Sequence, residues 1–246
     1  MRVFVDVGAH YGEALEVALD PAWGFDRIFL LEPASACQSL LRKFRDERII
    51  INPVALGAKN GIETLYGAGQ LGASLFRAKP QKASAAELKN ERIEVVRARE
   101  WFDNNIPPDA EVYMKFNCEG AECDIIDELL DGGFAHQLTS LYIDFDVRKI
   151  DHQAHRQGEV EAKLRKLDVP YRTPEELGLN GASGVGNWLA LDCPREQPTN
   201  LARLSFWLGL NKPAYLQFRR IVRSFVPKRA YWWLGRRFGR LGRNRG

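Results

Sequence analysis

The segment VFVDVGAHYGEALEVAL, Val3–Leu19, decides the fold class. A run of β-branched and aromatic residues is followed by a turn between Gly8 and Gly12, after which apolar residues recur at helical spacing. We therefore predict a strand over Arg2–Val7 and a helix over Glu13–Asp20. A strand, a glycine turn and a helix in this order are typical of nucleotide-binding α/β proteins.

The same alternation of strand-like and helix-like segments continues along the chain. It favours an α/β fold with a mostly parallel sheet and helices on both faces. Residues 67–92, rich in Gly, Ala and Lys, are expected to form an exposed loop, as lids often do. The other predicted elements are, in order, a strand in RIFLLEP ending at Glu32, a helix through Leu40, Leu41 and Phe44, a strand at Ile49–Ile51, an extra strand in GIETLYG, a strand ending at Phe116, a helix ended by Gly132 and Gly133, a strand in LTSLYIDFDV, a helix over His155–Leu167, and a closing antiparallel pair in VPYRT and VGNWLALD.

Length and composition indicate a folded protein in a reducing compartment. The chain of 246 residues is 45% apolar and 27% charged, which suits one large α/β domain with an appendage. A strand predicted within two residues of the start leaves no room for a signal peptide, and the uncharged run Leu204–Asn211 is too short to span a bilayer. We therefore expect a cytoplasmic protein. The cysteines form no CxxC pair and favour neither a disulfide framework nor a zinc site: Cys37, Cys118, Cys123 and Cys193.

The charge is divided unevenly along the chain. The net charge is +3, but residues 199–246 hold 12 of the 35 Lys and Arg and no Asp or Glu. The remaining residues therefore carry 23 basic against 32 acidic side chains, or −9. The boundary falls in DCPREQPTN, Asp192–Asn200, whose prolines are typical of a linker. We predict an acidic domain over 1–198 and a basic extension over 199–246.

The extension has the pattern of a basic amphipathic helix. Between Pro213 and Pro227 the apolar side chains fall on one face, and Arg219, Arg220 and Arg223 lie on the other. This pattern predicts contact with an anionic membrane surface, so that the protein is peripheral on the inner face. The alternatives are packing against the domain or a second subunit, giving a homodimer, and nucleic-acid binding, which the acidic domain disfavours.

The first glycine turn narrows the choice of nucleotide. Gly8 and Gly12 do not form the GxGxxG of dinucleotide sites, and no GK[ST] follows as in a P-loop. Asp6, inside the end of the first strand, is unfavourable beside a pyrophosphate but suits a ligand with an amino group and a sulfonium. Glu32 follows Gly12 by 20 residues and ends a strand, the place from which a carboxylate accepts bonds from ribose hydroxyls. Together these features point to S-adenosylmethionine.

Five further segments carry a family resemblance. FVDVGAHYGE, LEPASACQSLL, NPVALG, GASLF and YMKFNCEGAECDIIDELL resemble, in order, the motifs of the FkbM-type S-adenosylmethionine-dependent methyltransferases, over roughly residues 3–192. The resemblance implies the class I methyltransferase fold, Rossmann-like, with a seven-stranded sheet that has one antiparallel strand. It also implies O-methylation of hydroxyls, often on sugars, glycans or natural-product intermediates.

The resemblance assigns roles to individual residues. It places Glu32 on the ribose, Ser74 near the cofactor or the acceptor, and the stretch from Lys115 to Glu122 at the active-site end of the fourth strand. His10 stands where the family usually has a small polar residue such as Asn. Asn117 stands where it usually has Asp, which puts a divalent-metal mechanism in doubt, and no metal ligands are assigned. The other implied cofactor contacts are Asp6, Gly8, His10 and Gly12 around the methionine part, and Asn52, Val54 and Ala55 at the adenine end.

Methyl transfer to an alcohol also needs a base at the end of the sheet. The candidates are Glu119, Glu122, Asp144, Asp146 and His10, with Lys115 if it is buried and neutral. Our catalytic set is Glu119, Lys115, Asp144 and Asn117. Asp144 and Asp146 are expected to share a strand face and can alternatively hold a metal with Glu119. His136, His152 and His155 are expected on the surface, and Cys118 and Cys123 as buried apolar fillers.

Three hypotheses for function remain. The first is an S-adenosylmethionine-dependent O-methyltransferase that acts on a sugar hydroxyl of a glycan, polysaccharide or glycolipid precursor at the cytoplasmic membrane face. The second is a non-catalytic cofactor-binding or scaffold protein with the same fold, which Asn117 motivates. The third is a nucleic-acid methyltransferase that is recruited by the basic extension.

Overall fold

The computed structural model describes residues 1–68, 73–75, 90–150, 152–197 and 199–208. A six-stranded sheet forms its centre, with the order β3-β2-β1-β7-β8-β9, and all five pairs of neighbours are parallel. Counted within this sheet, the order is 3-2-1-4-5-6, that of the Rossmann-like doubly wound folds. The strands are β1 (Arg2–Val7), β2 (Arg27–Leu31), β3 (Ile49–Asn52), β7 (Glu111–Phe116), β8 (Leu138–Ile143) and β9 (Tyr171–Arg172).

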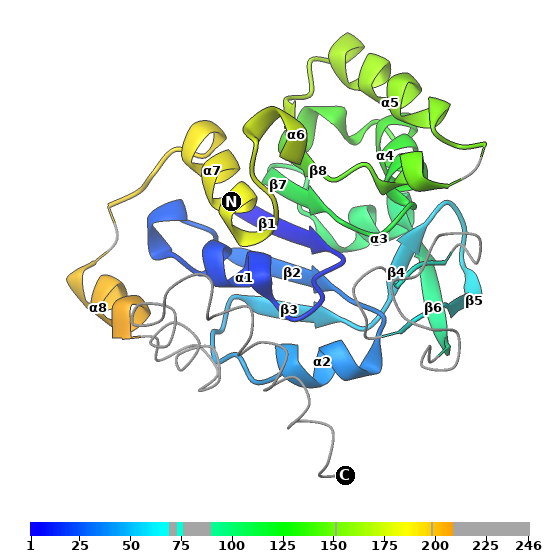
Figure 1. The fold of residues 1–246 in the computed structure, drawn as a ribbon. Helices are drawn as coiled ribbons and strands as arrows, with labels where there is room; N and C mark the ends of the chain where they lie inside the picture. The colour runs from blue at the N-terminus through cyan, green and yellow to red at the C-terminus, as the bar shows by residue number, and fades with distance from the viewer. Residues whose placement is uncertain (69–72, 76–89, 151, 198, 209–246) are drawn as a thin grey trace.

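Helices cover both faces of this sheet (Figure 1). Along β1, Val3, Val5 and Val7 belong to the core cluster beneath α3, α4 and α5. Phe4 points to the other face and packs with side chains of α1, α2 and α7. A strand that is apolar on both faces is what a central parallel strand requires. The helices are α1 (Glu13–Ala18), α2 (Ser35–Leu41), α3 (Ala98–Asn105), α4 (Glu122–Asp131), α5 (His155–Lys166), α6 (Pro174–Leu177), α7 (Gly181–Asp192) and α8 (Asn200–Leu208), with 3₁₀ turns η1 (Pro21–Trp23), η2 (Phe134–Gln137) and η3 (Asp146–Lys149).

A second, three-stranded sheet lies beside the first. Its order is β4-β6-β5, where β4 is Ala55–Gly57, β5 is Gly61–Leu65 and β6 is Glu91–Arg97. The extra strand predicted in GIETLYG is confirmed as β5, but β6 and the following α3 were not predicted. Part of the loop expected over 67–92, residues 69–72 and 76–89, lies outside the described residues.

The α/β class and the parallel sheet are confirmed, and the strand count is wrong. The described chain has six strands in the main sheet instead of seven, without the antiparallel one. VPYRT pairs with β8 in parallel through Tyr171 and Arg172. VGNWLALD lies within α7, because Val185, Trp188 and Leu189 at helical spacing bury one face against the sheet.

Two helix ends also differ from prediction. The helix expected to reach Asp20 ends at Ala18, because Asp20 caps η1 by accepting a hydrogen bond from Ala22 N at 3.0 Å. The helix expected through Phe44 ends at Leu41, and Phe44 follows in a single turn, its N–H bonded to Leu41 O.

Of the basic extension, the structure describes α8 and nothing after residue 208. The amphipathic helix predicted between Pro213 and Pro227 therefore lies outside the described residues. Phe206 of α8 packs against the core cluster that holds Trp23, while Leu204 and Trp207 are 51% and 68% exposed. None of the helices in the described part of the chain has the length and apolar content that a bilayer span requires.

Candidate functional site

The strand order reverses between β1 and β7, and the loops that follow these two strands meet at the carboxyl edge of the sheet. Gly8 has a φ of +80°, and a Cβ there would lie 2.1 Å from the carbonyl oxygen of Asn117. Asn117 N in turn donates to Val7 O at 3.0 Å. Only glycine fits this close approach, which explains the first glycine of the turn. In open parallel sheets, such a switch point is where ligands bind.

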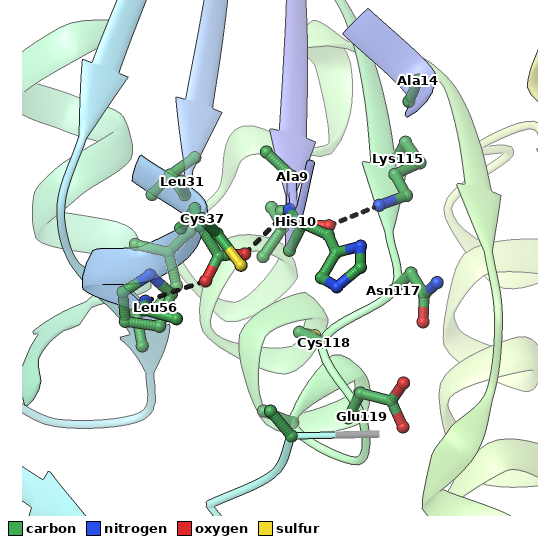
Figure 2. A pocket seen from close by; sticks show the side chains of 18 of the residues that line it. Ala9, His10, Ala14, Leu31, Cys37, Leu56, Lys115, Asn117, Cys118 and Glu119 are labelled. Atoms are coloured by element: carbon green, nitrogen blue, oxygen red, sulfur yellow. Dashed lines mark hydrogen bonds between the residues drawn. The ribbon is translucent and has the colours of Figure 1, made fainter. Parts of the chain in front are cut away.

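A cavity of about 230 Å³ lies at this point, and Figure 2 shows part of its lining. One end is apolar and the other is polar. The apolar end is formed by residues around β2 and the second sheet: Leu31, Pro33, Ala34, Cys37, Val54, Ala55, Leu56, Leu65, Ala73, Leu75 and Ile93. The polar groups come from the turn after β1 and the ends of β2, β7 and β8: His10, Glu13, Glu32, Lys115, Asn117, Glu119, Tyr142 and Asp144.

The carboxylate of Glu32 is fixed between two backbone amides. His10 N donates to one of its oxygens and Ala34 N to the other, both at 2.8 Å. The side chain is 7% exposed, and burial raises the pKa of its carboxyl although the two amides oppose this. Burying a carboxylate costs free energy, and a buried carboxylate at the edge of a cavity is typical of a ligand-binding group.

Asp6 and Lys115 form a buried ion pair beneath the turn. They are register partners on β1 and β7, and the alternation of each strand places them on the α1/α7 face with Phe4 and Tyr113. Lys115 Nζ lies 2.8 Å from Asp6 Oδ1 and donates to Gly8 O at 2.8 Å. Neither oxygen of Asp6 receives an aligned hydrogen bond from the described residues. Burial raises the pKa of Asp6, and the ammonium of Lys115 opposes this shift.

The turn after β7 brings two predicted residues to the cavity. Asn117 and Glu119 line it, and Glu119 has a φ of +61°. The hydroxyl of Ser74 donates to the backbone oxygen of Glu119 at 2.7 Å, so Ser74 stabilises this turn. Glu122 is fully buried outside the lining and accepts a hydrogen bond from Gly120 N at 2.8 Å.

Of the two aspartates after β8, Asp144 faces the cavity and Asp146 does not. The prediction that they share a strand face is wrong, because β8 ends at Ile143 and Asp146 begins η3. Asp144 lines the cavity, and burial, followed by repulsion from Asp146, raises the pKa of its carboxyl. Asp146 is buried and paired with Lys149. Within the described ranges, no group of three or more His, Cys, Asp or Glu side chains is placed to hold a metal.

Comparisons with known proteins give one likeness to report. No family model matches the chain, and no curated protein matches it. A solved structure of the methyltransferase FkbM from Methylobacillus flagellatus KT aligns with a TM-score of 0.43 and 18% identity. The alignment covers 69% of this chain and 38% of that one.

Nine of the thirteen predicted site residues line the cavity: Gly8, His10, Glu32, Val54, Ala55, Lys115, Asn117, Glu119 and Asp144. Four do not. Asp6 and Ser74 lie directly behind the lining, in the contacts described above. Gly12 begins α1 with a φ of +89°, and Asn52 accepts a hydrogen bond from Trp101 Nε1 at 3.3 Å. Gly12 and Asn52 therefore shape the surroundings of the cavity.

Sequence reasoning missed other lining residues. In the sequence, Glu13 is typical of the acidic residues in the first turn of a helix, and Cys37 is typical of an apolar residue within a helix. Tyr142 lines the cavity while its hydroxyl donates to Leu179 O at 3.2 Å. The residues expected on the surface, His136, His152 and His155, are exposed. Cys123 is buried as expected, whereas Cys118 is half-buried and lines the cavity.

The lining is predominantly acidic. Four carboxylates and one ammonium, Lys115, lie on the part of the wall that the described residues form: Glu13, Glu32, Glu119 and Asp144. The ammonium is already paired with the carboxylate of Asp6. This arrangement disfavours a ligand with several phosphates and favours one that carries positive charge.

Proposed function

We propose that this protein is an S-adenosylmethionine-dependent O-methyltransferase. The observation that carries the proposal is the acidic, nucleoside-sized cavity at the switch point of the sheet, with Glu32 fixed at the end of β2. ATP and NAD bring phosphate charges that these carboxylates would repel. S-adenosylmethionine carries two positive groups, a sulfonium and an ammonium, and one carboxylate. Its net positive charge therefore complements the acidic lining of the cavity.

The residues present fit this cofactor. Each oxygen of Glu32 accepts one amide hydrogen and keeps a second lone pair, which can accept from a ribose hydroxyl. The apolar end, with Val54, Ala55 and Leu56, suits an adenine ring. The carboxylate of Asp6, which is paired with Lys115 but accepts no aligned hydrogen bond from the described residues, and the bare backbone at Gly8 suit the methionine part. When bound, the cofactor supplies an electrophilic methyl group on sulfur.

The protein's part in the reaction is positioning and proton transfer. Glu32 and the glycine turn orient the donor, so that most of the catalysis comes from holding the acceptor oxygen in line with the methyl group. The acceptor proton must leave as the new bond forms. Glu119, Asp144 and His10 line the cavity and can receive it, whereas the Nζ of Lys115 is already engaged with Asp6 and with the carbonyl oxygen of Gly8.

The acceptor that we propose is a sugar hydroxyl of a glycan, polysaccharide or glycolipid precursor. The polar end of the cavity offers the amide of Asn117, the carboxylates of Glu119 and Asp144, and Tyr142. An amide both donates hydrogen bonds to and accepts them from the hydroxyls of a sugar ring, and carboxylates accept hydrogen bonds from these hydroxyls. The resemblance of the motifs to the FkbM family supports the same class of acceptor.

We further propose that the extension places the protein on the cytoplasmic face of an anionic membrane, where a lipid-linked acceptor resides. Leu204 and Trp207 share the exposed face of α8, next to the exposed Arg203, and residues 199–246 carry 12 basic and no acidic side chains. An exposed tryptophan beside arginines suits the headgroup region.

Liposome flotation of the full chain tests this placement. Wild type should float with anionic vesicles and much less with zwitterionic ones, and L204S/W207S should float less with both. The matched control is I62S, since Ile62 is also exposed, at 56%, but lies on β5. Equal flotation of wild type with both lipids would exclude an electrostatic membrane contact.

Transfer of labelled methyl from S-adenosylmethionine to a panel of free and lipid-linked glycans tests the activity. We expect label on the oxygen of one acceptor class, with E32Q strongly reduced and E47Q, an exposed control, unchanged. Cofactor binding without transfer to any acceptor would favour the scaffold hypothesis. Transfer to RNA or DNA instead would favour the third hypothesis.

A further inference from the structure

The imidazole of His10 has one nitrogen engaged and one without a partner. Nδ1 lies 3.4 Å from Oε1 of Glu13, which follows three residues later at the start of α1. Nε2 is buried and has no hydrogen-bond partner among the described residues. Buried polar atoms in native proteins are nearly always satisfied, and an exception indicates a functional role or a bound partner.

The backbone holds this ring in one place. His10 has a φ of +48°, a conformation that costs free energy for a residue with a side chain. Its N–H donates to Glu32 at 2.8 Å, and its ring lies against Tyr11 with a centroid separation of 3.8 Å. The turn is therefore stabilised by the same carboxylate that we assign to the ribose, and this fixes His10 relative to the cofactor.

His10 also lies where the two halves of the cavity meet. Both His10 and Glu13 line the cavity. In Figure 2 the imidazole lies between Cys37, on the apolar side, and Asn117 with Glu119, on the polar side. The junction between a nucleoside half and an acceptor half is where the methyl group and the acceptor oxygen must meet.

We propose that His10 is the general base of the methyl transfer and that Glu13 is its positioning residue. The inference rests on the proposed function. The O–H bond of the acceptor breaks and its proton passes to Nε2 as the O–CH₃ bond forms. The bond between the methyl carbon and sulfur breaks, and its electron pair stays on sulfur. The products are a methyl ether, a thioether and an imidazolium paired with Glu13.

Two of the other candidates, Lys115 and Asp144, are already engaged by charged partners. The Nζ of Lys115 already contacts Asp6 and the carbonyl of Gly8. The carboxylate of Asp144 lies 3.9 Å from the guanidinium of Arg148, so this group already has an ion-pair partner. His10 combines a lone pair without a partner, a place on the cavity wall and an orienting carboxylate, which is the arrangement of a catalytic dyad.

The charges around His10 support the product state. The carboxylates that act on it are Asp6 from β1, Glu13 from α1 and Glu32 after β2, and Lys115 from β7 lies among them. Burial raises the pKa of Glu13, but its hydrogen bond to the His10 ring, a backbone hydrogen bond and the nearby ammonium of Lys115 contribute to a net lowering. Glu13 is therefore ionised and stabilises an imidazolium beside it.

Two measurements test the proposal. The first needs no acceptor: ¹⁵N NMR of the histidine rings with S-adenosylhomocysteine bound, where H10N assigns one signal among the 4 histidines. We expect the neutral tautomer with the proton on Nδ1, and a loss of that preference in E13Q. The control is E16Q, on the same helix but outside the cavity. A proton on Nε2 in wild type would overturn the proposal.

The second measurement uses the acceptor found in the glycan panel. H10N should bind S-adenosylhomocysteine within about threefold of wild type, while kcat falls by roughly 10²–10⁴-fold and the acidic limb of its pH profile disappears. E13Q should shift that limb and lower kcat by about tenfold, and H136N should change neither. An H10N enzyme that keeps kcat within fivefold would refute the base, whereas failure of wild type to bind S-adenosylhomocysteine would refute the proposed function itself.

Discussion

Replacing Glu32 by glutamine separates ligand binding from stability. A carboxylate bonded to two ribose hydroxyls gains about 1–1.5 kcal/mol more per bond than a neutral acceptor. The expected loss is therefore about 2–3 kcal/mol of binding free energy, or roughly 30- to 150-fold in Kd for S-adenosylhomocysteine. Titration calorimetry measures this change directly, with E47Q as the exposed control that keeps wild-type affinity.

The same substitution should leave the fold intact. Burial raises the pKa of Glu32 above its ordinary value, so its ionised form is disfavoured in the folded state in spite of the two amides. Glutamine keeps one acceptor oxygen and turns its NH₂ group toward the second amide, which costs about 1–3 kcal/mol. The lost burial penalty of the carboxylate offsets part of this cost, so E32Q should unfold no more than about 6 °C below wild type, since 1 kcal/mol corresponds to about 2–4 °C in a domain of this size. A large loss of thermal stability, or unchanged affinity, would contradict the assignment of Glu32 to the ligand.

The pH dependence of E32Q gives an independent check. Because the folded pKa of Glu32 is raised, its contribution to stability is fully present below the unfolded pKa and is lost as pH rises through the folded pKa. Wild type should thus lose stability relative to E32Q as pH rises through this window. Its affinity for S-adenosylhomocysteine should fall as pH is lowered through the same window, and that of E32Q should not.

Three further predictions concern the surroundings of the site. G8A should lower the free energy of unfolding by about 2–5 kcal/mol, because a Cβ at a φ of +80° lies 2.1 Å from the oxygen of Asn117, and thermal unfolding measures this loss. S140A should cost about 1–3 kcal/mol, since buried Ser140 accepts from Trp188 Nε1 at 2.8 Å, and a wild-type melting temperature would refute the role of this bond. Burial raises the pKa of all four cysteines, that of Cys37 to about 12, so iodoacetamide at pH 8 should label the unfolded but not the native protein by mass spectrometry.

Helices and strands whose apolar residues recur at one regular spacing were predicted well from the sequence. Val3–Leu19 combines a buried strand, a turn that only glycine can form and an amphipathic helix, so that all local preferences agree. VGNWLALD was misassigned because its β-branched and aromatic content outweighed the helical spacing of Val185, Trp188 and Leu189. Glu91–Arg97 was missed although the buried Ile93 and Val95 alternate with the exposed Arg92 and Glu94, because the segment follows a loop in which apolar residues do not recur at a regular spacing.

Site residues that directly follow a strand could be predicted from the sequence. Those that reach the cavity through contacts between distant elements could not. Glu32 and Asn117 follow strands directly, and carboxyl ends of parallel strands share one edge of the sheet. The apolar wall depends on Leu65 and Ile93, which reach the cavity only because β5 and β6 pair in a second sheet. The contact of Glu13 with His10 depends on the left-handed backbone of the turn, which the residue types alone do not specify.

The central claim is that an acidic nucleoside cavity selects a sulfonium cofactor over phosphate-bearing nucleotides. Titration calorimetry of the wild-type protein with S-adenosylmethionine, S-adenosylhomocysteine, NAD⁺ and ATP tests it most directly. We predict one site for each of the first two ligands, with Kd on the order of micromolar, or about −8 kcal/mol, and no measurable heat with NAD⁺ or ATP. Binding of NAD⁺ or ATP in the absence of binding by either S-adenosyl ligand would contradict the account.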